Sequence, residues 1–155
     1  MFLSVAGVEG APVPETSETY RNLGASLRRF GDPLVPMRIV NHRDARFRCR
    51  LSVKLLTDDQ TDPVIAAVEA ALRAHFAFAQ RDFGQPVSLD ELTAVAQAVP
   101  GVLAVHATRL YRAGTPPALA PRLFAALPVA SLTAPPEAAE LLTLSDDPIE
   151  LEVLP

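Results

Sequence analysis

Four basic residues on one predicted strand have the types and the spacing to bind another molecule: Arg46, Arg48, Arg50 and Lys54. They alternate with other residues, and a period of two places them together on the face of the strand that points away from the core. Guanidinium groups pair with carboxylate or phosphate oxygens, often through two parallel hydrogen bonds. This basic ladder, as we call the four residues, therefore predicts an interface for an acidic partner.

Two other partners would suit the basic ladder. A nucleic acid would match its charge, but nucleic-acid sites usually add aromatic side chains for base stacking, and this face has none. The net charge of −4 also argues against a dedicated nucleic-acid binder. The chain's own C-terminus is the second alternative, because residues 134–155 contain six acidic and no basic residues, whereas residues 21–54 contain nine basic and two acidic residues.

No residues show the spacing of an active site. None of the three histidines lies at metal-ligand spacing from another ligand type: His42, His75 and His106. The single cysteine, Cys49, alternates onto the apolar side of the strand, which is typical of a small buried hydrophobic residue and not of a nucleophile. No glycine-rich phosphate loop and no Gly-x-Ser-x-Gly motif occurs.

An acidic cluster formed by Asp58, Asp59 and Asp62 also lacks the pattern of a metal site. A calcium loop needs a glycine at its turn and a final bidentate glutamate, and neither is present here. Asp62 followed by Pro63 is instead typical of a helix start. We therefore expect no catalytic, cofactor-binding or metal-binding residues and no enzyme activity. An enzyme whose site is completed by another part of a longer protein is the alternative in that class.

The elements around the basic ladder follow from apolar periodicity. The strand at 46–55 directs every second residue to a core: Phe47, Cys49, Leu51, Val53 and Leu55. A helix at 62–78 carries an apolar stripe on one face: Ile65, Val68, Leu72 and Phe76. A second helix at 88–98 begins with the capping box of Ser88 and Glu91. We expect both helices on one side of a mixed sheet, in an α+β fold with two small layers or subdomains.

The remaining segments flank this predicted body. A helix runs from Thr16 or Ser17 to Phe30, with its own apolar stripe of Tyr20, Leu23, Leu27 and Phe30. Residues 102–111 predict a strand in which two alternate sets of residues could face inward. The Pro/Ala-rich residues 113–136 predict an extended arm, with a helical turn only at 122–127. Residues 137–155 predict a C-terminal β-hairpin that turns at 146–148.

Composition and length describe an ordinary globular chain. The 155 residues are 49% hydrophobic and 21% charged, which is enough to form a core without disulfides. A single cysteine fits a reducing compartment. No apolar run is long enough for a membrane-spanning helix, and the N-terminus lacks the pattern of a signal peptide. We therefore expect a protein that is cytoplasmic when it is made.

The order of several segments resembles a known family. The helix start at 62–68, the Phe-Gly-Gln-Pro bend at 83–86 with its capped helix, and the Val-Pro-Gly-Val turn at 99–102 resemble the C-terminal domain of phage baseplate J-like proteins. Residues 5–10 and 140–144 are also similar to segments of that family. Such proteins are usually longer, so we expect the chain to be part of a longer protein.

The resemblance implies a structural component of the baseplate wedge, in a contractile phage tail or a related contractile injection system. Its partners would be other wedge, hub and sheath-proximal proteins, met in multiple copies around a ring, with no cofactor and no membrane. The implied division is an N-terminal α/β segment at 1–56, a helix–helix–strand segment at 57–112, the arm at 113–136 and the hairpin at 137–155. A small α+β module that binds a ligand or nucleic acid through Arg46, Arg48 and Arg50 is the second interpretation.

Overall fold

The protein has an α+β fold, as the sequence predicts. The computed structural model describes residues 1–32, 34–56, 61–130 and 136–155. Asp58 and Asp59 of the acidic cluster, and residues 131–135 of the arm, lie outside these ranges. The elements follow in the order β1 (Phe2–Val5), η1 (Val8–Gly10), α1 (Glu18–Phe30), β2 (Arg38–Asn41), β3 (Arg43–Leu55), α2 (Thr61–His75), η3 (Phe78–Gln80), β4 (Val87–Ser88), α3 (Leu89–Gln97), β5 (Val102–Arg112), β6 (Arg122–Leu123), β7 (Glu140–Leu144) and β8 (Glu150–Leu154).

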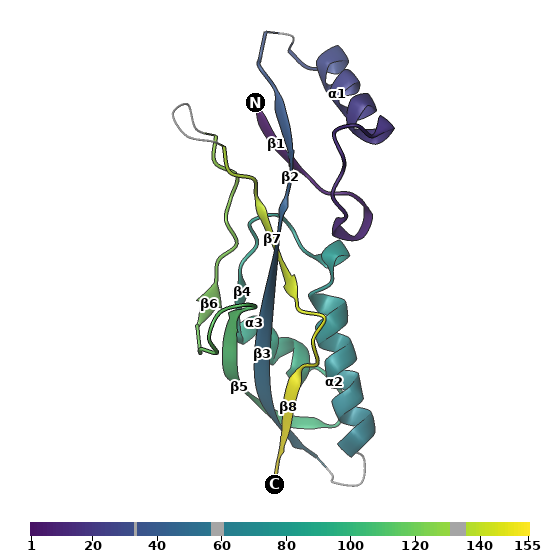
Figure 1. The fold of residues 1–155 in the computed structure, drawn as a ribbon. Helices are drawn as coiled ribbons and strands as arrows, with labels where there is room; N and C mark the ends of the chain where they lie inside the picture. Colours follow the sequence, from purple (N-terminus) through teal and green to yellow (C-terminus); the bar gives the residue numbers. More distant parts are fainter. Residues whose placement is uncertain (33, 57–60, 131–135) are drawn as a thin grey trace.

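The main sheet is built around β3, the strand that carries the basic ladder (Figure 1). On one edge, β5 pairs with it in the antiparallel direction. On the other edge, β7 and β8 both pair with it in the parallel direction. The sheet is therefore mixed, which confirms the prediction. β3 therefore has paired neighbours on both edges along most of its length, and of the ladder residues Arg48 alone lies between the segments that pair with β7 and β8.

The predicted C-terminal hairpin is wrong, because β7 and β8 do not pair with each other. The strand β7 pairs with Arg43–Phe47, and β8 pairs farther along the same edge with Arg50–Lys54. The segment between them bulges outward without reversing the chain, and Arg73 holds it by donating hydrogen bonds to the carbonyl oxygens of Ser145 and Asp147 at 3.3 and 3.0 Å. A strand of 13 residues offers an edge long enough for two short strands in line, so each satisfies its backbone there.

The core lies between the main sheet and the helices α2 and α3. Phe47, Leu51 and Val53 are fully buried, as the alternation in β3 predicts. From the helices, the core receives the fully buried side chains of Val68, Leu72 and Leu92, and Phe76, directly after α2, is buried with them. The rings of Phe47 and Phe76 meet edge to face, with centroids 5.1 Å apart. This packing holds one face of β3 against the helices. The ladder residues project from the opposite face of the same fixed strand.

The helix boundaries differ slightly from the predicted ones. The helix α2 begins at Thr61, so Asp62 lies in the first turn, where its carboxylate complements the helix dipole without capping the helix. It ends at His75, a few residues before the predicted end. At the start of α3, the Ser88 hydroxyl accepts a hydrogen bond from the Glu91 N–H at 3.1 Å, which is one half of the predicted capping box. The Glu91 carboxylate does not complete the box, because it binds Arg81 and His75 instead.

The strand β5 buries members of both inward-facing sets that the sequence left open, and neither set faces inward as a whole. Its register against β3 shifts between Arg50 and Leu51 and again between Lys54 and Leu55. Each β-bulge inserts one unpaired residue and exchanges the two faces of the strand. As a result, Val102, Ala107 and Leu110 are buried although no single period of two connects them.

The N-terminal unit, formed by β1, β2 and α1, lies beyond the end of the main sheet (Figure 1). Its two strands pair in parallel, and the Ser17 hydroxyl caps α1 by accepting from the Tyr20 N–H. The Tyr20 hydroxyl donates to the Ile39 carbonyl oxygen at 3.1 Å, which ties α1 to β2. The predicted apolar stripe is only partly covered, because no residue of α1 is buried and Phe30 is 81% exposed.

The Pro/Ala-rich arm is extended where the structure describes it. A helical turn at 122–127 is absent there, because Arg122–Leu123 form β6 and pair with β4. The prolines at 121 and 128 restrict the backbone on both sides of this segment. The Leu123 side chain packs against the core, and the Leu89 N–H donates to the Pro121 carbonyl oxygen at 3.1 Å. The part of the arm around β6 therefore lies on the body of the protein.

Candidate interaction surface

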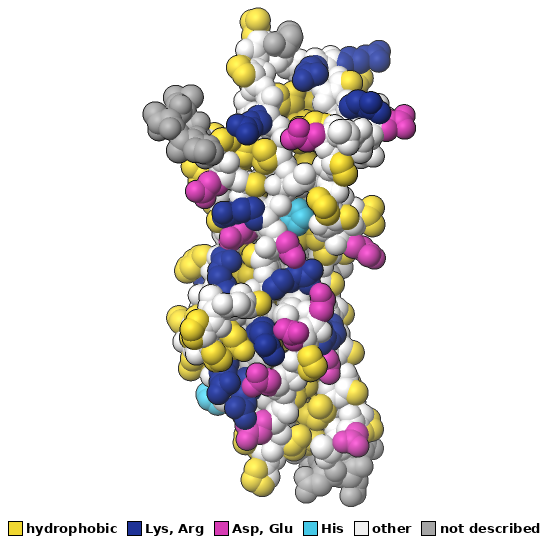
Figure 2. All heavy atoms as spheres, in the orientation of Figure 1, with side chains coloured by type: hydrophobic (Ala, Val, Ile, Leu, Met, Phe, Trp, Pro, Cys, Tyr) yellow, Lys and Arg dark blue, Asp and Glu magenta, His cyan; other side chains and the backbone are white. Residues whose placement is uncertain are grey.

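The basic ladder lies on the face of β3 opposite the core, as the sequence predicts. The side chains of Arg46, Arg48 and Arg50 are 39%, 36% and 35% exposed. Figure 2 shows basic and acidic side chains interleaved along this part of the molecule. The ladder is therefore accessible, but it does not stand alone.

The acidic C-terminus supplies carboxylates to all three arginines. Arg48 Nη1 lies 3.6 Å from Asp147 Oδ2. Arg50 Nη2 lies 3.2 Å from Glu152 Oε2, and a second carboxylate, that of Glu150, lies 4.0 Å from Arg50 Nε. The parallel pairing of β7 and β8 with β3 creates this arrangement, since it places acidic residues beside basic ones in register.

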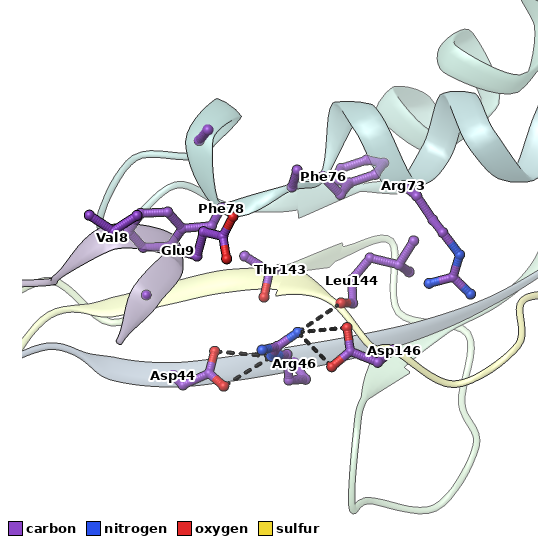
Figure 3. Close-up of a pocket in the computed structure, with 13 residues that line it drawn as sticks. Val8, Glu9, Asp44, Arg46, Arg73, Phe76, Phe78, Thr143, Leu144 and Asp146 are labelled. Carbon is purple, nitrogen blue, oxygen red and sulfur yellow. Dashed lines mark hydrogen bonds and ion pairs between the residues drawn. The ribbon is translucent and has the colours of Figure 1, made fainter. Parts of the chain in front are cut away.

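Arg46 has the densest set of partners in the ladder (Figure 3). Its Nε lies 2.9 Å from Asp44 Oδ2, and its Nη1 lies 3.4 Å from an Asp146 oxygen and from the Leu144 carbonyl oxygen. The hydrogen bond that Arg46 donates to the Asp44 carboxylate raises the pKa of Arg46 above its ordinary value, against the opposite effect of burial. Lys54, at the end of the ladder, donates a hydrogen bond to the carbonyl oxygen of Pro155. The three arginines of the ladder are thus paired with carboxylates within the chain, and Lys54 is bound by a carbonyl oxygen.

Glu140 is a further charged residue at this surface, and sequence reasoning missed it. Its carboxylate accepts hydrogen bonds from Arg43 at 3.2 Å, from Arg112 at 2.7 Å and from the Ala126 N–H at 2.9 Å. Burial raises the pKa of Glu140, but these hydrogen bonds and the two positive charges outweigh burial and leave the pKa below its ordinary value. Glu140 therefore joins β3, β5 and the arm through one carboxylate.

A cavity of about 650 Å³ opens beside Arg46, where the N-terminal unit meets the body (Figure 3). Aromatic side chains of Phe76 and Phe78 line it, together with Arg73, which is held 2.8 Å from Glu69. The buried hydroxyl of Thr143 also lines the cavity and has no hydrogen-bond partner. Since both arginines in the lining are already paired, the cavity offers shape and apolar surface, and no group in it is arranged as a nucleophile with a base.

The cysteine and the three histidines considered in the sequence analysis do not form a reactive site in the part of the chain that the structure describes. Cys49 is buried, and burial raises its pKa to about 12. His75 Nε2 lies 3.0 Å from Glu91 Oε1, while His42 lies beside the ring of Phe83 with centroids 5.7 Å apart. Within the ranges that the structure describes, no three His, Cys, Asp or Glu residues are grouped to hold a metal ion. His106 is exposed on β5.

Arg81 holds the bend that carries part of the family resemblance. Its side chain is fully buried and donates to Glu91 Oε1 at 2.8 Å and to the Pro86 carbonyl oxygen at 2.7 Å. Its guanidinium carbon also lies 5.3 Å from the centroid of the Phe76 ring. At the second motif, Gly101 has a φ of 96°, and a Cβ there would come within 2.8 Å of Val64. The residues of both motifs are therefore explained by local structure: buried hydrogen bonds at the bend, and a backbone conformation and close contact that require glycine at the turn.

Comparison with known families gives a match at the N-terminal unit. Residues 1–40 match the family model described as the baseplate J-like central domain. This supports a baseplate J-like family for the chain, but through its N-terminal residues and the central domain, not through the C-terminal domain that the motifs at 62–105 suggested. Comparison with curated proteins gave no match.

A baseplate J-like domain indicates a structural role in a phage baseplate, contact with other baseplate components and assembly into a phage tail. The matched residues cover β1, η1, α1 and most of β2. In the described part of the chain, no helix is long and apolar enough to cross a bilayer. The segment that carries the family signal is thus the one whose helix is least covered by the rest of the chain.

Proposed function

We propose that this chain, whose residues 1–40 are baseplate J-like, is a component of the baseplate wedge in a contractile phage tail or a related contractile injection system. It acts through protein–protein contacts and catalyses no reaction. Multiple copies stand around a ring and meet hub and sheath-proximal proteins. The match at residues 1–40 is the single observation that carries the proposal.

The N-terminal unit supports a contact role on physical grounds. A two-stranded sheet is marginally stable on its own, and α1 adds no buried residue to it. Large apolar side chains remain exposed at this end of the molecule, with Phe30 at 81% and Leu34 at 89%. A unit with this much uncovered surface gains stability when a neighbouring protein packs on it.

The basic ladder supports the same proposal in a different way. Its ion pairs add to the backbone pairing that holds β7 and β8 along β3. The body is therefore a rigid unit that can transmit force from one neighbouring protein to another. The groups in this region that could react are not available for chemistry. Cys49 is buried with a raised pKa, and Arg48 and Arg50 are paired with carboxylates. A nucleic-acid partner would have to compete with those carboxylates.

Deletion of the coding region in a host that makes the particle tests the proposal. Electron microscopy of the lysate should show few complete tails, because a missing wedge component blocks baseplate closure. Expression of the wild-type chain from a plasmid should restore complete tails. Normal numbers of contractile tails after deletion would contradict a wedge role.

A further inference from the structure

A groove of about 400 Å³ lies between α1 and β2 in the N-terminal unit, away from the basic ladder. Three of its lining residues are exposed arginines: Arg21, Arg28 and Arg38. Figure 2 shows basic side chains gathered over this end of the molecule. The helix α1 supplies two of them from one face, because positions 21 and 28 are two helical turns apart.

These three arginines differ from those of the basic ladder in having no carboxylate partner. Every ladder arginine lies within 4.0 Å of an acidic side chain. Among the described residues, none pairs with the guanidinium of Arg21, Arg28 or Arg38, although Glu15 lines the same groove. The protein therefore neutralises its central arginines internally and leaves a positive groove on the unit that carries the family match.

We propose that this groove binds an acidic polypeptide segment of a neighbouring baseplate protein. The inference deepens the proposed wedge function and rests on it. Arginine forks pair with carboxylates through two hydrogen bonds and are enriched at protein interfaces, so three of them define an acidic partner. Met37 and Ile39 also line the groove and supply apolar surface beside the charges.

A polypeptide fits the groove better than a nucleic acid. Single-stranded nucleic acids need open aromatic faces on which bases stack. Tyr20 is the aromatic residue in the lining, and its hydroxyl is bound to the Ile39 carbonyl oxygen with the ring against the helix–strand junction. The net charge of −4 also repels a polyanion from the rest of the surface, whereas a short acidic segment meets only the groove.

Binding of fluorescent probes to the full chain tests this proposal. A labelled oligoglutamate peptide should bind more tightly than an oligoglutamine peptide or an oligothymidylate, with an affinity that falls as salt rises. The double variant Arg21→Gln/Arg28→Gln should bind oligoglutamate at least about tenfold more weakly. The matched control Arg29→Gln/Arg122→Gln removes the same charge outside the groove and should bind like the wild type. Glutamine is well tolerated in helices, and circular dichroism checks that both variants fold.

Three results would overturn the inference. The wild type would bind oligoglutamate no better than oligoglutamine, or both double variants would lose affinity equally, or oligothymidylate would bind more tightly than oligoglutamate. Incorporation into tails separates this inference from the proposed function. If the wild type enters baseplates and the groove variant enters equally well, the groove proposal fails alone. If the wild type never enters, the wedge function fails, and the groove loses its baseplate partner with it.

Discussion

Arg50 and Glu152 lie 102 positions apart in the chain, and yet Arg50 Nη2 is 3.2 Å from Glu152 Oε2. This contact follows from the parallel register of β8 on β3, which places Glu152 opposite Ser52 and near Arg50. The acidic C-terminus is therefore the partner that the basic ladder meets in the structure. Arg21, Arg28 and Arg38, which have no carboxylate partner among the described residues, lie elsewhere, on the N-terminal unit.

Reversing the basic ladder should destabilise the fold. The triple variant Arg46→Glu/Arg48→Glu/Arg50→Glu places like charges beside the C-terminal carboxylates, and we expect a loss of about 1–3 kcal/mol, given up to about 1 kcal/mol for each exposed pair. Urea denaturation measures it. The matched triple Arg21→Glu/Arg28→Glu/Arg38→Glu should unfold like the wild type, because those residues have no partners to lose. An unchanged midpoint for the ladder variant, together with failure to assemble, would make the ladder an intermolecular interface.

Truncation of Leu72 should remove a central part of the core. Leu72 is fully buried between α2 and the sheet. Leu72→Ala should therefore lower the free energy of unfolding by about 2–5 kcal/mol, the usual cost of a lost buried leucine and its cavity. Equilibrium denaturation checks the value. Truncation of the exposed Leu103 on β5 is the control and should change stability by less than about 0.5 kcal/mol.

The position of Leu72 could be predicted from the sequence, and that of the C-terminal strands could not. The stripe of α2 and the alternation of β3 are local patterns, and a period of 3.6 or two residues fixes which side is buried. The direction of β8 depends on which edge of β3 is free and on Arg73 holding the connection at Ser145 and Asp147. A turn sequence such as Asp146-Asp147-Pro148 is compatible with a hairpin or with an outward bulge, so local reasoning chose the commoner outcome.

Part of the candidate interaction surface could likewise be predicted from local patterns, and part could not. The face and the residues of the basic ladder followed from alternation. Its neutralisation by Asp147 and Glu152 needed the strand pairing, although the charge asymmetry of the chain had raised the alternative. Glu140 and the buried Arg81 gave no local signal, because each collects partners from segments far apart in the sequence or from carbonyl oxygens in a bend.

Glu140→Gln should change how stability depends on pH. The pKa of Glu140 is lowered in the folded protein, so its carboxylate stabilises the fold above the unfolded pKa, and this contribution is lost as pH falls through the folded pKa. At neutral pH we expect the variant to be less stable by about 1–3 kcal/mol, as for a lost hydrogen bond to a charged group. The difference from the wild type should shrink below the ordinary value of 4.5. Denaturation at several pH values measures it, and a difference that stays constant into acid would refute the role of Glu140.

The thiol of Cys49 should be unreactive in the folded protein. It is buried in the core face of β3, and its pKa is raised to about 12, so almost no thiolate is present at neutral pH. A colorimetric disulfide reagent should therefore label Cys49 only at the rate at which the sheet opens, and quickly in denaturant. Rapid labelling of the native chain would show that the β3 core is open.

Quantitative mass spectrometry of purified, salt-washed baseplates tests the central claim most directly. If the chain is a wedge component, its peptides should be present in every preparation at a fixed multiple-copy ratio to the other wedge proteins, and the ratio should survive repeated sedimentation. A protein that acts through contacts in the baseplate must occupy a fixed number of positions there, which sets that ratio. Peptides found only in the soluble fraction, or a ratio that falls with each wash, would contradict a structural role in the baseplate.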